Sequence, residues 1–138
     1  MNYFDMTLTK SEINGKNILA LSHLGDGVYE LAVRTFLCAD HTFTNRSLHL
    51  ETLKYVSASA QAKAFTLIED MLSEEERATF LRGRNARIRY TPKSCSKADY
   101  HTATGLEALM GALYLGGSKA RICELLDRIF ENKELFEP

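Results

Sequence analysis

Two acidic residues, Asp26 and Glu107, lie in apolar stretches of helical spacing and have no basic side chain one helical turn away. The positions three and four residues from Glu107 hold alanine, threonine, methionine and glycine, and those before Asp26 hold histidine and serine. Glu30, four residues after Asp26, would repel it, although Arg34 can pair with Glu30. A carboxylate near apolar neighbours is costly unless it is paired. Each acid therefore needs water, a cation from another segment or a metal ion; taken singly, each is more simply a partly exposed acid.

Glycines surround both acids, although a glycine inside a helix costs about 1 kcal/mol relative to alanine. Gly25 and Gly27 flank the first acid, and Gly105 and Gly111 lie near the second. Small residues at these positions would let two helices cross closely and bring the two carboxylates together. Paired carboxylate oxygens suit Mg²⁺, which usually also binds phosphate groups. The pattern predicts metal-assisted hydrolysis of a phosphodiester.

A basic segment supports a phosphate-containing ligand. Residues 77–97 carry seven cationic side chains and no acidic one, whereas the whole 138-residue chain has a net charge of −1. The remainder is therefore acidic, with a net charge of −8. Such a concentrated charge is consistent with phosphate binding and, equally, with a solvated basic face. Arg77 can instead pair with Glu74 on its own predicted helix.

Elements that could position these residues are helical, because apolar residues recur every three or four positions and strand signals are nearly absent. The spacing predicts helices over about 18–37, 48–71, 74–87, 100–115 and 119–130, with a polar connection at 38–47 and a break in the pattern at 89–97. Ser73 and Glu76 form a capping-box pattern, and Ser118 is expected to cap the last helix. Pro92 and the pair Gly116–Gly117 are expected to stop helices. We expect an all-α fold with a single domain.

Composition excludes several other classes. No apolar run approaches the roughly 20 residues of a membrane span, and the N-terminus lacks the apolar region of a signal peptide. Cys38, Cys95 and Cys123 are odd in number and far apart, so neither a disulfide framework nor a zinc site is indicated. Free thiols are typical of a reducing compartment, and we expect a cytoplasmic protein with no membrane partner.

Two motifs resemble a known family. "HLGDGVYEL" is similar to the signature helix of the ribonuclease III family, and "TGLEALMGALYL" is similar to its second acidic helix, with matching order and separation. "KYVSASAQAKA" and "RGRNA" are closer to the short Mini-ribonuclease III branch, which consists of the nuclease domain without a double-stranded-RNA-binding domain. The resemblance covers about residues 16–130.

The resemblance implies an all-helical homodimer that cuts double-stranded RNA with Mg²⁺, for which Mn²⁺ can substitute, and that matures the precursor of large-subunit (23S) ribosomal RNA in bacteria. It makes Asp26 and Glu107 the catalytic residues and metal ligands. The basic residues suit phosphates of duplex RNA, whose deep major groove is closed to side chains. The candidate RNA-binding residues are Arg82, Arg84, Asn85, Arg87, Arg89, Lys93 and Lys97. Of these, Arg87, Arg89, Lys93 and Lys97 are expected in a loop after the helix, whereas Arg84 and Asn85 could equally be structural.

Two positions depart from the full-length enzymes of the family. Ser22 and Thr104 stand where those enzymes often have glutamate and aspartate, which leaves fewer protein oxygens for a second ion. A non-catalytic RNA- or ribosome-binding scaffold with the same fold is the alternative function. We expect the dimer surface on the apolar side of the first motif, near Tyr29, Val33 and Phe36.

Overall fold

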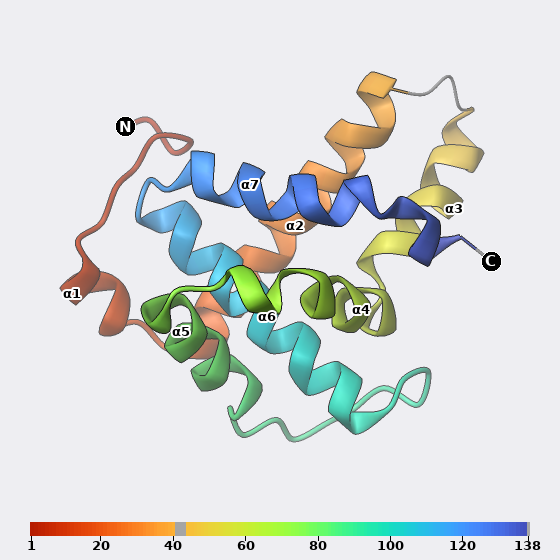
Figure 1. The fold of residues 1–138 in the computed structure, drawn as a ribbon. Coiled ribbons are helices and arrows are strands. Elements are labelled where there is room, and N and C mark those ends of the chain that lie inside the picture. Colours follow the sequence, from red (N-terminus) through yellow and green to blue (C-terminus); the bar gives the residue numbers. More distant parts are fainter. Residues whose placement is uncertain (41–43, 138) are drawn as a thin grey trace.

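The computed structural model describes residues 1–40 and 44–137, and within these ranges it contains helices and no β-strand. This confirms the predicted all-α class. Figure 1 shows α6 running through the middle of the molecule, with α7 crossing in front of α2. The elements in chain order are α1 (Lys10–Asn14), α2 (Ile18–Asp40), α3 (Asn45–Val56), α4 (Ala58–Ile68), the 3₁₀ turn η1 (Glu69–Met71), α5 (Glu74–Arg84), α6 (Lys97–Leu115), α7 (Lys119–Glu131) and the 3₁₀ turn η2 (Lys133–Phe136).

Local signals explain most helix ends. The predicted capping box is present: Ser73 Oγ accepts from the Glu76 amide at 3.1 Å, and Glu76 Oε1 accepts from the Ser73 amide at 2.9 Å. α6 ends at the predicted glycine pair, where Gly117 takes a positive φ of 76°. There the amides of Gly117 and Ser118 donate to the carbonyls of Tyr114 and Leu113, a Schellman motif that satisfies the last turn. Ser118 begins α7 as predicted, but its hydroxyl makes no capping hydrogen bond.

Several predicted boundaries are wrong. The first helix continues to Asp40 instead of 37, and the second begins at Asn45 instead of 48. The predicted helix 48–71 is broken at Ser57, whose ψ of 156° ends α3 and whose hydroxyl accepts from the Ala60 amide at the start of α4. Helical periodicity does not reveal this break, because it occupies one residue. The helix predicted to reach residue 87 ends at Arg84, and α6 starts at Lys97, where Ser96 caps it. Residues 41–43 of the predicted connection 38–47 lie outside the described residues.

The α2–α6 crossing depends on two glycines. A Cβ at Gly25 would lie 1.6 Å from the carbonyl oxygen of Glu107, and a Cβ at Gly111 would lie 2.0 Å from that of Leu21. The predicted close crossing is therefore present, and Gly25 and Gly111 permit it. Gly27 has nothing within 4 Å of its Cβ position and plays no part in the contact.

A second close crossing joins α5 to α6. A Cβ on Gly83 would lie 2.7 Å from the Ala108 side chain, and one on Gly105 would lie 2.7 Å from the Phe80 ring. The prediction that Gly105 serves the crossing with the first motif is thus wrong, because Gly105 faces α5. This crossing fixes the end of α5, which lies within the basic segment, against the helix that carries Glu107.

The core lies where α2, α4, α6 and α7 meet. Tyr29 and Val33 are fully buried in it. They cannot form the dimer surface predicted for them, since α6 and its neighbours already cover that side of α2. Phe36 alone of the three is partly exposed, and its ring stacks on Phe130 with centroids 4.2 Å apart.

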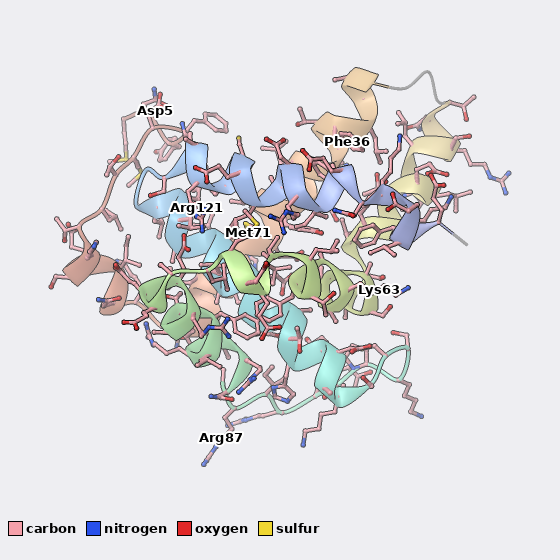
Figure 2. The ribbon with its side chains drawn as sticks, in the orientation of Figure 1. Asp5, Phe36, Lys63, Met71, Arg87 and Arg121 are labelled. Carbon is pink, nitrogen blue, oxygen red and sulfur yellow. The ribbon has the colours of Figure 1, made fainter. Side chains whose placement is uncertain are left out.

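One ion-pair cluster ties α7 to the rest of the fold. The Arg121 guanidinium donates to both Glu76 oxygens at 2.9 and 3.0 Å, to Glu124 at 2.9 Å and to the Met71 carbonyl at 2.7 Å. Arg121 and Met71 lie close together in Figure 2. The hydrogen bond from Arg121 holds the pKa of Glu76 below its usual range. No helix within the described ranges combines the length and apolarity needed to cross a bilayer.

Candidate active site

The two acids predicted from the sequence meet at the α2–α6 crossing. Asp26 is exposed on α2, whereas Glu107 on α6 is partly buried, and the two side chains line the same two pockets. Glu107 also accepts from the Ser22 hydroxyl at Oε1 and from the Gln61 amide at Oε2, both at 3.4 Å. The close approach at Gly25 makes this pairing possible, because Gly25 precedes Asp26 and contacts the backbone of Glu107.

The acid pair lacks a protein cation. Neither acid forms an ion pair within the described ranges of the chain. Burial, followed by the hydrogen bond and the charge of Asp26, raises the pKa of Glu107 from an ordinary value of 4.5 to about 8. Two adjoining carboxyl groups with no cationic side chain paired to them in the described residues are a set of oxygen ligands into which a hard divalent ion fits.

Without a divalent ion, the wild type is expected to lose stability as the pH rises from about 4.5 to about 8. Over this range the unfolded carboxyl ionises while folded Glu107 keeps its proton, so protons favour the folded state. Glu107→Gln cannot ionise and should lose less stability over the same range. Urea unfolding in a chelator at pH 5, 6.5 and 8 measures the difference.

Added Mg²⁺ is the control for this pH effect. It should restore stability at pH 8 in the wild type, where the ion replaces the proton, and should do little for Glu107→Gln. Parallel pH dependences of the two proteins in the chelator would contradict the assignment of the effect to Glu107.

Two pockets border the acid pair. The first, of about 240 Å³, is lined by Asp26 and Glu107 together with Ile88 from the segment between α5 and α6. The second, of about 410 Å³, is again lined by both acids and by Pro92, Ser94 and Cys95 from that segment. Four uncharged residues of the basic segment therefore border the same two hollows as the acid pair, and its cationic side chains lie next to them in the sequence.

All seven predicted RNA-binding residues are exposed. Figure 2 shows Arg87 projecting away from the body of the molecule. Arg84 is the last residue of α5 and lies over the Phe80 ring, 5.9 Å from its centroid. Arg82 donates to the Lys16 carbonyl at 3.5 Å. Lys97, predicted in the loop, is instead the first residue of α6. The acid pair and this basic edge thus form one candidate site.

Two neighbouring side chains have structural contacts. Arg77 pairs with Glu69 at 3.4 Å and donates to its carbonyl at 2.9 Å, so the predicted pairing with Glu74 is wrong. The His101 Nδ1 atom is hydrogen-bonded to the Arg84 carbonyl at 2.9 Å and so joins the end of α5 to α6. This contact gives His101 a role in holding the start of the basic segment.

Comparison with known proteins decides the family. The model of the ribonuclease III domain matches residues 19–118. The chain belongs to the ribonuclease III family. It is 43% identical over 120 residues to the Mini-ribonuclease 3 of Thermoanaerobacter sp. (strain X514), an alignment that covers 87% of this chain and 84% of the relative. It is 38% identical over 128 residues to the Mini-ribonuclease 3 of Kosmotoga olearia, covering 93% and 85% of the two chains.

A solved structure shares this fold. The X-ray crystal structure of protein FN1578 from Fusobacterium nucleatum is 28% identical and superposes with a TM-score of 0.81, covering 88% of this chain and 98% of that one. As a member of the ribonuclease III family with Mini-ribonuclease 3 relatives, this chain is an endoribonuclease.

Ser22 and Thr104, the two positions at which this sequence departs from the full-length enzymes of the ribonuclease III family, make different hydrogen bonds. Ser22 donates to Glu107, whereas the Thr104 hydroxyl donates to the Tyr100 carbonyl of its own helix at 3.0 Å. The described residues contain no cluster of three or more acidic, histidine or cysteine side chains suited to a metal ion. Among the described residues, the acidic side chains that meet at this crossing are therefore Asp26 and Glu107.

Sequence reasoning missed Gln61. It is 2% exposed and reaches Glu107 from α4, a helix predicted only as a continuation of the preceding one. A signal was present, because Gln61 is an amide between alanines on the apolar side of "SASAQAKA". Its partner could not be predicted, since that required the break at Ser57.

Proposed function

We propose that this chain is a Mg²⁺-dependent endoribonuclease that cleaves double-stranded RNA. The observation that carries the proposal is that Asp26 and Glu107 border the same two pockets as the segment between α5 and α6. A metal-binding acid pair beside a cationic edge is suited to a phosphodiester substrate. Mn²⁺ is expected to replace Mg²⁺ because both accept carboxylate oxygens.

The proposed roles of the acids follow from their surroundings. Asp26 and Glu107 would hold the divalent ion through their carboxylate oxygens. When bound, the ion supplies a Lewis acid and an activated water for phosphodiester hydrolysis. Asp26 is exposed, whereas partly buried Glu107 accepts hydrogen bonds from Ser22 and Gln61.

Duplex RNA is the substrate that the basic edge favours. Recognition of A-form RNA rests on phosphates and 2′-hydroxyls, so it needs cations spread along a surface rather than a deep base pocket. The seven exposed residues on this edge supply those contacts: Arg82, Arg84, Asn85, Arg87, Arg89, Lys93 and Lys97. Binding that depends on these charges weakens steeply as salt rises.

A homodimer would give a duplex two cutting centres related by two-fold symmetry. The surface available for it is an apolar groove of about 420 Å³ between α2 and α7, where Val28, Leu31, Ile122 and Leu126 meet. Leu31 is 59% exposed in this groove. A second copy of the chain would cover this apolar surface. This groove replaces the surface predicted around Tyr29 and Val33.

The biological substrate proposed from the resemblance to the Mini-ribonuclease III branch is the precursor of large-subunit (23S) ribosomal RNA, in the cytoplasm. A non-catalytic RNA- or ribosome-binding scaffold is the competing function. The acid pair without a protein cation favours the enzyme, because a scaffold gains nothing from the cost of two adjoining carboxyl groups.

The test is incubation of the protein with a long duplex RNA in Mg²⁺, with a single-stranded RNA and a duplex DNA of the same sequence as controls. Cleavage of the duplex RNA is expected, with loss of cleavage in a chelator and recovery in Mn²⁺. Binding of the duplex, measured in Ca²⁺ or a chelator, should weaken as salt rises. Binding without cleavage in Mg²⁺ or Mn²⁺ would instead establish the scaffold.

A further inference from the structure

Glu107 is held by two polar side chains from two different helices. Ser22 on α2 donates to Oε1, and Gln61 on α4 donates to Oε2, each at 3.4 Å. Both donors are buried, with exposures of 7% and 2%. A carboxylate that receives one donor on each oxygen is fixed in the plane of the carboxyl group as well as in its position.

The buried amide of Gln61 lowers the stability of the fold. Its Nε2 donates to the Val56 carbonyl at 3.1 Å and to Glu107, but its Oε1 has no hydrogen-bond partner in the part of the chain that the structure describes. A buried acceptor left unpaired costs about 1–3 kcal/mol. An apolar side chain of similar size would avoid that cost, so stability alone does not explain a glutamine here.

Capping of the preceding helix is the competing explanation for Gln61. Val56 is the last residue of α3, and its carbonyl would lack this partner if Gln61 were replaced. Ser22 distinguishes the two explanations, because its hydroxyl donates to Glu107 and has no part in the α3–α4 break. The two side chains have one target in common, which is the carboxyl group of Glu107.

We propose that Gln61 and Ser22 are positioning residues, which hold the two oxygens of Glu107 in the orientation required to bind a divalent ion with Asp26. The inference rests on the proposed function. A carboxylate has about four acceptor sites, so two donors leave the remaining sites to the ion and its waters. Both hydrogen bonds are long, and they therefore orient the carboxylate more than they stabilise the fold.

The experiment measures three quantities for the wild type, Gln61→Met, Ser22→Ala and the matched control Ser22→Thr, which keeps the hydroxyl. These are the affinity for Mn²⁺ without RNA, the free energy of unfolding in a chelator, and kcat and KM on duplex RNA. Gln61→Met should bind Mn²⁺ about tenfold more weakly, the low end for residues that orient metal ligands. Ser22→Ala should show a smaller loss, and Ser22→Thr should bind like the wild type.

Stability and kinetics separate positioning from a structural role. The free energy of unfolding of Gln61→Met should equal or exceed that of the wild type, and kcat should fall in both Gln61→Met and Ser22→Ala with KM retained. Unchanged Mn²⁺ affinity in both variants would overturn the inference while leaving the nuclease intact. A loss of activity that tracks a loss of stability in Gln61→Met, with Ser22→Ala unaffected, would assign Gln61 to the α3 cap. A wild type that binds no Mn²⁺ would overturn both proposals.

Discussion

Asp26→Asn and Glu107→Gln are each expected to cleave duplex RNA at least about a thousandfold more slowly than the wild type, because loss of about 4 kcal/mol of transition-state stabilisation corresponds to that factor. Each variant replaces a carboxylate at the α2–α6 crossing by an uncharged amide of nearly the same size. Single-turnover cleavage in Mg²⁺ measures the chemical step without product release. A double variant that is no slower than either single variant would indicate that the acids act on one ion as a unit.

The matched control is Glu30→Gln, the same kind of change one turn further along α2. Glu30 is paired with Arg34 at 3.1 Å and lines neither of the two pockets beside the acids, so cleavage should be unchanged. Duplex binding should persist in Asp26→Asn and Glu107→Gln, since the cations lie on other residues and a negative charge has been removed. Normal cleavage by either acid variant would refute the assignment of the metal site.

The pairing of Asp26 with Glu107 could be predicted because its signals are chemical and local. An acid without a helical partner must find one elsewhere, and glycines nearby indicate where a second helix can approach. Gly25 and Gly111 bear out this reasoning, each admitting a backbone carbonyl of the other helix. Gly27 shows its limit, because an exposed glycine and a buried one look alike in the sequence.

Other features depended on tertiary packing that periodicity does not encode. The break at Ser57 turns α4 toward Glu107, yet the helical spacing of apolar residues continues across it from Leu53 and Val56 to Ala60. The sequence predicts a dimer interface on the apolar face of α2. In the structure, α6 and its neighbours bury Tyr29 and Val33 on that face within one chain. A hydrophobic stripe indicates burial without specifying whether another helix or another molecule provides it.

Gly25→Ala is expected to destabilise the protein by at least about 3 kcal/mol, the upper end of the usual cost of overpacking. The added Cβ would lie 1.6 Å from the Glu107 carbonyl oxygen and 2.5 Å from its carbonyl carbon. Both are backbone atoms, so no side-chain rotation can relieve the contact and the two helices must separate. Urea unfolding in a chelator measures the loss, and the protein that remains folded should cleave poorly, since Glu107 moves with its backbone.

Gly27→Ala is the matched control, two residues further along the same helix. Its Cβ meets nothing within 4 Å, so the change should stabilise α2 by up to about 1 kcal/mol through helix propensity alone. The free energy of unfolding should fall in Gly25→Ala and rise in Gly27→Ala. This contrast separates the effect of the helix crossing from the effect of a glycine in a helix. If Gly25→Ala were as stable as Gly27→Ala, α2 and α6 would lie further apart than this structure has them, and Asp26 and Glu107 could not share one ion.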